Sequence, residues 1–259
     1  MKASELKFSD LPKRVVSALI FGLVAIGALK AGGLVCAIFL CLCFFILTWE
    51  VFYICSGGKL SLTELPVVIP MFLSTVPILQ FYNLYPIFVL FIFSGLSLLH
   101  TAGKLIKFCC ILYIGIAIII LQSLLLSNME PTPINHVIFI LLIVISSDIG
   151  GYIFGRFVGG PKIWAVLSPQ KTWAGSIGGI ALAIITCCIL KPILNYSLIE
   201  LLIISIVLAI ASQLGDLLES AIKRNFNVKD SGFFMPGHGG LFDRLDGLIL
   251  ALPVYMLIN

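Results

Sequence analysis

Residues 220–246 have the sequence SAIKRNFNVKDSGFFMPGHGGLFDRLD, a polar segment in a chain that is 60% hydrophobic. One apolar run, 198–222, leads into this segment, and another, 241–258, leaves it. A membrane-spanning helix needs about 20 predominantly apolar residues, so both runs are candidates for membrane helices. The sequence therefore predicts two membrane-embedded helix ends that flank one polar hairpin.

Acidic side chains lie on both predicted helices, close to the hairpin. A shared helix face is predicted by the spacing i, i+3, i+4 and i+7 of Asp216, Glu219, Ser220 and Lys223. Asp243 and Asp246 share a face of the second helix by the same rule. Helix-capping acids around a solvated loop would explain the loop equally well, but charges that continue into apolar helices are costly and usually functional. Each helix is therefore predicted to present a carboxylate stripe.

The loop between the helices combines glycines with cations. Gly237, Gly239 and Gly240 permit positive φ, which lets backbone N–H groups approach an anion. The basic side chains that could pair with phosphate are Lys223, Arg224 and Lys229. Because Mg²⁺ binds carboxylates together with phosphate oxygens, this combination indicates metal-assisted phosphoryl or nucleotidyl transfer.

The segment resembles the signature of the phosphatidate cytidylyltransferase family. The signature residues recur here as Ser220, Lys223-Arg224, Lys229-Asp230, His238-Gly239-Gly240 and Asp243-Arg244-Leu245-Asp246. The departure is Met235, where the family more often has Leu, Ile or Phe, and this exchange keeps the position apolar. The match is long and specific.

A second polar cluster lies in residues 146–179. Asp148, Tyr152 and Arg156 are spaced i, i+4 and i+8, so they line one helix face. Lys171 and Thr172 precede a glycine-bearing helix start, which can receive phosphate oxygens through its backbone N–H groups. Without further information, a plain helix start would account for these two residues as well.

The resemblance extends to this second cluster. The family carries Ser-Asp, Gly-Arg, Ser-Pro-x-Lys-Thr and Gly-Gly in this order, here Ser147-Asp148, Gly155-Arg156, Ser168-Pro169-Gln170-Lys171-Thr172 and Gly178-Gly179. Ala174 departs from the Glu or Gln that relatives commonly have there. The resemblance covers residues 146–253, whereas residues 1–135 match only as a set of apolar spans.

Composition and charge predict an all-α, polytopic integral membrane protein. With 11% charged residues, a soluble domain is excluded. Of the 16 lysines and arginines, only Lys30 and Lys191 fall outside if the N-terminus is cytoplasmic and nine helices span the membrane. The nine predicted spans are 14–29, 34–54, 66–82, 85–99, 106–127, 136–157, 174–194, 198–222 and 241–258.

The prolines, the cysteines and one acidic residue of the apolar spans lead to further predictions. The third and fourth spans contain prolines and would alternatively form one re-entrant hairpin, but the lysine distribution favours nine spans. Glu50, beside Trp49, is interpreted as a residue at the membrane interface. The eight cysteines form no C-x-x-C pair and are predicted to be buried hydrophobes. No removable signal peptide is predicted.

We expect one continuous membrane domain in which residues 1–135 form a scaffold and residues 136–259 form the catalytic region. The resemblance implies that CTP and phosphatidate react to give CDP-diacylglycerol and pyrophosphate. The distribution of lysine and arginine predicts that the site faces the cytoplasm, and a bacterial inner membrane is the expected location. Asp216 and Asp243 are the expected Mg²⁺ ligands, and Asp246 and Glu219 are expected to bind the ion as well or to orient its ligands. The site would also accommodate a second cation. The residues expected to bind substrate are Lys171, Thr172, Ser220, Lys223, Arg224, Lys229, Asp230, His238, Gly239, Gly240, Asp148 and Arg156.

Three other functions are compatible with parts of the pattern. A cation-coupled transporter would also carry intramembrane acids, but it needs sites near the membrane midplane. A CTP-dependent polyprenol or lipid kinase would need a base for its hydroxyl nucleophile. A purely structural membrane protein leaves the charges of 216–246 unexplained. Membrane lipids are expected partners and nucleic acid is not, and whether the protein forms a homodimer stays open.

Overall fold

The computed structural model describes residues 11–59, 90–92, 94–99, 103–127, 132–165, 167–235 and 239–258. The chain forms two compact units. Unit 1 comprises Met1–Gly115 and Asn225–Arg244, and unit 2 comprises Ile116–Arg224 and Leu245–Asn259. Both units combine segments that are far apart in the sequence. The division into a scaffold, 1–135, and a catalytic region, 136–259, stays a prediction.

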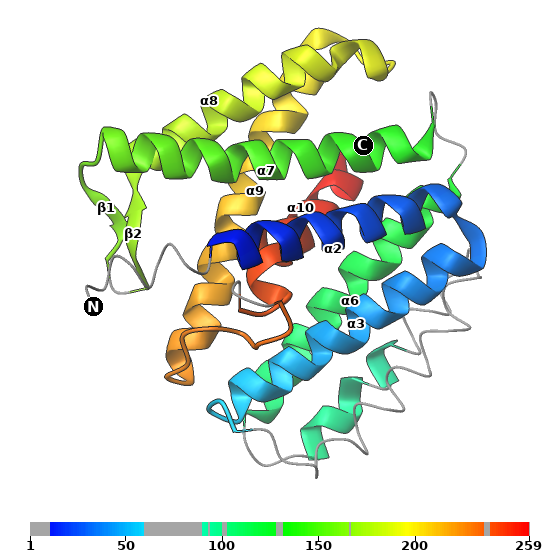
Figure 1. Ribbon diagram of the computed structural model, residues 1–259, viewed down its shortest axis with the longest axis vertical. Helices are drawn as coiled ribbons and strands as arrows, with labels where there is room; N and C mark the ends of the chain where they lie inside the picture. Colours follow the sequence, from blue (N-terminus) through cyan, green and yellow to red (C-terminus); the bar gives the residue numbers. More distant parts are fainter. Residues whose placement is uncertain are drawn as a thin grey trace. The chain divides into compact units, whose positions relative to one another are not determined.

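Unit 1 contains α2 (Leu11–Ala31), α3 (Gly33–Cys55), a short 3-10 helix η2 (Leu96–Leu99) and the first half of α6 (Lys104–Leu126). The chain turns between α2 and α3 at Gly32 and Gly33, whose φ angles are 63° and 48° (Figure 1). Such positive φ angles suit glycine, because it has no Cβ. The buried face of α3 is largely apolar, with Leu40, Leu47 and Phe52 buried, and it also contains Thr48 and Glu50.

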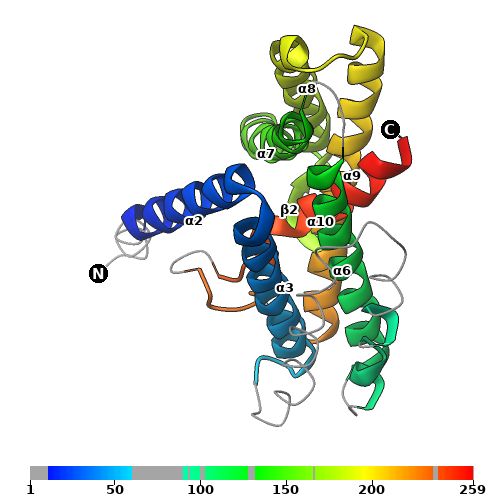
Figure 2. The same ribbon diagram turned by 90° about the vertical axis from the view of Figure 1, so that its right-hand side faces the viewer.

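Unit 2 contains the second half of α6, α7 (Pro133–Phe157), α8 (Trp173–Leu190), a 3-10 helix η3 (Lys191–Ile193), α9 (Leu198–Asn225) and most of α10 (Phe242–Ile258). Helices α7 and α8 pack closely, and both views show them side by side (Figures 1 and 2). Glycines make this possible: a Cβ on Gly150 would lie 2.6 Å from the carbonyl oxygen of Gly178. The glycines of the second polar cluster thus have a packing role, which small residues commonly have between membrane helices.

A short hairpin connects α7 to α8 and departs from the all-helical prediction. Strands β1 (Lys162–Trp164) and β2 (Ser168–Thr172) pair antiparallel, with Lys162 opposite Thr172. Figure 1 shows the hairpin at the C-terminal end of α7. The segment is too short and too rich in glycine and proline for a helix, and its β-branched and aromatic residues favour extended backbone.

Among the described residues, five helices are long and apolar enough to cross a membrane. They are Gly33–Cys55, Lys104–Leu126, Pro133–Phe157, Trp173–Ile193 and Leu198–Asn225, and each coincides with a predicted span. Large apolar side chains such as Ile189, Ile199 and Ile203 are exposed on these helices, as lipid contact requires. The protein is therefore a multi-pass membrane protein.

The predicted total of nine spans stays a prediction. Helix α2 has a shorter apolar part, Val16–Ala31, and α10 is 17 residues long. The predicted span 66–82 lies outside the described residues, and the span 85–99 is described only in part.

Candidate active site

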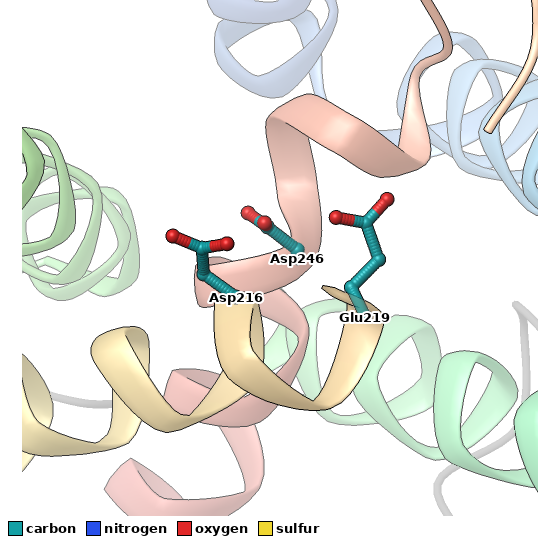
Figure 3. Close-up of side chains that lie close together, drawn as sticks. All are labelled: Asp216, Glu219 and Asp246. Atoms are coloured by element: carbon teal, nitrogen blue, oxygen red, sulfur yellow. The ribbon is translucent and has the colours of Figure 1, made fainter. Parts of the chain in front are cut away.

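Three carboxylates come together in unit 2. Asp216 and Glu219 project from α9, Asp246 projects from α10, and one oxygen of each lies within 4.8 Å of the others. Figure 3 shows the three side chains close together, two from α9 and one from α10. Glu219 is buried, whereas Asp216 and Asp246 are partly accessible. A group of hard oxygen donors at this spacing can hold a divalent cation such as Mg²⁺.

Close contact between α9 and α10 brings these carboxylates together. A Cβ on Gly215 would collide with the carbonyl oxygen of Asp246, and a Cβ on Gly247 would lie 2.5 Å from the Ser212 hydroxyl oxygen. Each helix thus places a glycine where the other approaches. Because the two backbones can meet closely, short aspartate side chains from both helices reach the same point.

Two lysines pair with carboxylates of the cluster. The Lys171 ammonium lies 2.5 Å from Asp216 Oδ2, and the Lys223 ammonium lies 3.1 Å from Glu219 Oε2. The Ser220 hydroxyl lies 3.5 Å from Asp216 Oδ1. The pair of Lys223 and Glu219 follows from their i, i+4 spacing, whereas Lys171 arrives from the β hairpin. The structure thus joins Lys171, from the second polar cluster, to Asp216, from the first.

The start of α8 and a half-buried glutamine of α9 surround Lys171. Thr172 caps α8, because its hydroxyl oxygen accepts a hydrogen bond from the Gly175 N–H at 3.1 Å. Lys171 also reaches the Gln213 carbonyl oxygen at 3.4 Å. The Gln213 side chain donates to the Ser147 hydroxyl and to the Ser176 carbonyl, and accepts from the Ser176 hydroxyl. The sequence interpretation missed Gln213, although a glutamine inside an apolar helix was a visible signal.

Asp243 occupies a different environment, in unit 1. Its Oδ2 accepts hydrogen bonds from the Ser231 N–H at 3.0 Å, the Ser231 hydroxyl at 2.9 Å and the Gly240 N–H at 3.0 Å. Gly239 has a φ of 88°, and a Cβ there would lie 2.8 Å from Asp243 Oδ2. Asp243 thus organises the polar loop within unit 1. The pairing of Asp216 with Asp243 as metal ligands stays a prediction.

Glu50 is buried, which differs from its interpretation as an interface residue. Only 2% of its surface is exposed, and its two carboxylate oxygens accept hydrogen bonds from the Leu241 N–H at 2.8 Å and the Phe242 N–H at 2.7 Å. The interface interpretation is wrong because the first turn of α10 supplies donors that replace water. The position of Glu50 inside an apolar run was the sequence feature that could have indicated its burial.

The remaining predicted site residues lie on accessible surfaces or outside the described residues. Asp148 and Arg156 are exposed on α7, and the Arg156 guanidinium donates to the Tyr152 hydroxyl at 2.7 Å. Arg224, Lys229 and Asp230 are also exposed. His238 lies outside the described residues.

A carboxylate cluster flanked by lysines can hold a divalent cation next to phosphate oxygens, which is the arrangement that phosphoryl and nucleotidyl transfer need. The sequence profile of the cytidylyltransferase family matches residues 12–259. The chain belongs to the cytidylyltransferase family, and it is an enzyme of that type.

Proteins similar to this chain carry one common name. A phosphatidate cytidylyltransferase of Staphylococcus saprophyticus is 35% identical over 254 residues, which cover 93% of this chain and 96% of that protein. The phosphatidate cytidylyltransferase of Bacillus subtilis is 37% identical over 134 residues, about half of each chain. That of Brucella suis is 41% identical over 141 residues, again about half of each. The transporter and lipid-kinase alternatives receive no support from these relatives.

Proposed function

We propose that this enzyme is a phosphatidate cytidylyltransferase, which forms CDP-diacylglycerol and pyrophosphate from CTP and phosphatidate. The observation that carries the proposal is the cluster of Asp216, Glu219 and Asp246 with Lys171 and Lys223 beside it. A phosphatidate oxygen would form a bond to the α-phosphorus of CTP, and the bond to the departing pyrophosphate would break. The attacking phosphate is already anionic, so the reaction needs charge neutralisation and positioning rather than a strong base.

Mg²⁺ is the proposed cofactor, and the donor set fits it. The cluster offers three carboxylates with oxygens within 4.8 Å, and Mg²⁺ prefers hard oxygen ligands from a few carboxylates and substrate phosphates. Asp216, Glu219 and Asp246 would hold the ion, and the sequence adds Asp243 as a proposed ligand. When bound, the ion would neutralise charge on the triphosphate.

The basic side chains are proposed to bind the phosphates. Lys171 lies against Asp216, so a phosphate oxygen that approaches the cluster comes within reach of its ammonium group. Lys223 is buried beside Glu219, which holds it at the inner side of the cluster. An ammonium group in such a place stabilises developing negative charge more strongly than one in bulk water.

A substrate-omission experiment tests the activity. Purified protein in detergent is supplied with Mg²⁺ and with CTP or ATP, combined with phosphatidate or a polyprenol, and pyrophosphate release is measured. Release only with CTP and phosphatidate together supports the proposal. Phosphorylation of the polyprenol without pyrophosphate would identify a lipid kinase, and no turnover with any pair would contradict an enzyme of this kind.

Arg224 provides a test of triphosphate binding. We expect Arg224→Ala to lower kcat/KM for CTP by roughly tenfold, since a hydrogen bond to a charged group contributes about 1.5–3 kcal/mol. Arg224→Lys should recover only part of the loss, because it keeps the charge but removes the bidentate fork. Lys191→Ala, which removes an exposed cation predicted to lie on the outer side, is the matched control. Wild-type kinetics in both Arg224 variants would leave this residue with a topological role only.

We propose that the protein lies in the cell membrane with its active site facing the cytoplasm. In a background without native cysteines, Gln170→Cys and Phe233→Cys should react with an impermeant thiol reagent only from the cytoplasmic side, because the distribution of lysine and arginine places both there. Asn195→Cys, in the connection predicted to lie outside, should react only from the outer side. Labelling of position 170 or 233 from outside would refute this orientation. All three positions are exposed.

A further inference from the structure

Glu50 connects α3 to the polar loop, which we define as the described residues 226–235 and 239–241. The carboxylate accepts hydrogen bonds from two backbone N–H groups at the start of α10, those of Leu241 and Phe242. The Ser231 hydroxyl lies 3.4 Å from Glu50 Oε2 and donates to Asp243 at 2.9 Å. All of these residues belong to unit 1. One buried carboxylate thus contacts the middle of the polar loop and its C-terminal end.

Two glycines of the loop make room for this carboxylate. A Cβ on Gly232 would lie 2.9 Å from Glu50 Oε1, and a Cβ on Gly240 would lie 2.8 Å from it. Neither glycine has a positive φ, so the need for glycine at these positions comes from the approach to Glu50 and Ser231 rather than from backbone conformation. The loop is therefore shaped around the glutamate side chain.

The C-terminal part of α3 contacts the loop at one further point, and a residue of each lies near Gly103. The rings of Tyr53 and Phe233 pack edge to face, with centroids 6.2 Å apart. Phe226 and Cys55 both approach Gly103, at 2.8 Å and 3.2 Å from where its Cβ would be. Glu50 and Tyr53 thus connect α3 directly to the loop.

A buried carboxylate is expensive unless hydrogen bonds replace its hydration. A purely apolar contact between α3 and the loop would hold the fold at lower cost, and the first N–H groups of a helix are ordinarily satisfied by a local cap. Here the donors of Leu241 and Phe242 are instead directed to a residue on another helix. The arrangement specifies one position of the loop and of the α10 start relative to α3.

We propose that Glu50 is a positioning residue for turnover, which holds the polar loop and the first turn of α10 in the conformation that the reaction requires. It touches no reacting atom and acts through Ser231, Asp243 and the backbone of Leu241 and Phe242. The inference rests on the proposed role of the loop in binding the triphosphate. It also assigns a function to the N-terminal half, where the sequence indicated only scaffold.

Glu50→Gln is the first test, because the amide keeps the size of the side chain. One of its polar ends is an N–H₂ group, which cannot accept from a backbone N–H, so one of the two N–H groups loses its partner. We expect kcat/KM for CTP to fall at least tenfold, since a shift of about 1 Å at a positioned group can cost 100-fold. Amide hydrogen exchange should rise in peptides that cover 231–235 and 239–242, and stay unchanged in α7 and α8.

Glu200→Gln is the matched control. Glu200 also accepts a backbone N–H at a helix start, that of Ser197 at 2.8 Å, but it is exposed and caps its own helix, α9. The control should leave kcat/KM and the exchange of the loop unchanged. If Glu50 served only global stability, Glu50→Gln would raise exchange throughout unit 1 without changing the kinetics of the folded fraction, and that result would overturn the proposal.

A second-site experiment keeps the proposal testable if Glu50→Gln folds poorly. In the wild-type background, Gly232→Ala should lower activity, because its Cβ meets the carboxylate. In the Glu50→Ala background, which removes that carboxylate, the same change should cost at least threefold less. Equal costs in both backgrounds would overturn the proposal, because coupled residues do not act additively.

Lys229→Ala separates this inference from the proposed role of the loop. If Lys229→Ala weakens CTP use while Glu50→Gln has wild-type kinetics, the loop binds substrate and the positioning role of Glu50 is refuted. If neither variant has an effect, both ideas fail. If Glu50→Gln alone lowers turnover and loosens the loop, the positioning role stands and the contact of Lys229 with the triphosphate is refuted.

Discussion

Replacing Asp216 by Asn is expected to lower turnover by about 100-fold at saturating CTP and phosphatidate, and added Mg²⁺ should not restore it. An amide keeps the size of the side chain but loses the negative charge that a hard cation needs, and a lost ligand typically costs tenfold or more. The variant should fold, because Asp216 is partly accessible and lies at the edge of the cluster. Pyrophosphate release over a range of Mg²⁺ concentrations is the measurement.

Two further variants give this experiment its controls. Glu200→Gln removes an exposed acid from the start of the same helix and should leave turnover unchanged. Asp243→Asn should cause a loss similar to that of Asp216→Asn, since Asp243 is the second ligand that the sequence predicts. If either Asp216→Asn or Asp243→Asn retained more than about a tenth of the activity, its assignment as a ligand would be untenable.

The second large effect is expected from Gly215→Ala. Its Cβ would overlap the carbonyl oxygen of Asp246, so α10 must move away from α9. Overpacking of this kind costs about 1–3 kcal/mol, against a gain of up to about 1 kcal/mol from the helix propensity of alanine. Because the displaced helix carries Asp246, activity should fall further than stability, by up to about 100-fold. Thermal unfolding in detergent and pyrophosphate release measure the two effects.

Gly27→Ala is the matched control for this experiment. Gly27 is exposed on α2, and a Cβ there would meet no atom within 4 Å. The control should be neutral or slightly stabilising, because alanine favours a helix over glycine. Wild-type activity in Gly215→Ala would show that the close approach of α9 and α10 is not needed to assemble the carboxylates.

The positions of most long helices could be predicted from apolar runs in the sequence. The predicted spans 34–54, 106–127, 136–157 and 198–222 coincide with α3, α6, α7 and α9, because an apolar run of this length has few alternatives in a membrane. The hairpin of β1 and β2 was missed, since strands of three and five residues leave too short a pattern to detect. The predictions for 66–82 and for His238 concern residues outside the described part of the chain.

Helical periodicity also predicted which side chains share one face of a helix. Lys223 pairs with Glu219, and Ser220 lies near Asp216, because residues four apart share a helix face. The signature residues of both polar clusters led to the cytidylyltransferase family, to which the chain belongs. Helix faces and sequence motifs can be predicted without the structure, because each depends on residues that are close together in the sequence.

Only the tertiary structure showed which elements meet. Asp246 joins Asp216 and Glu219 because Gly215 and Gly247 let two helices touch, and Lys171 reaches the same cluster from a hairpin. Glu50, interpreted from the sequence as an interface residue, is buried against the start of α10. The periodicity of a helix identifies its polar face but not the partner of that face. Two features determine which element packs against a polar face: how closely the two backbones can approach, and whether a buried charge meets hydrogen-bond donors. Both depend on residues that are distant in the sequence.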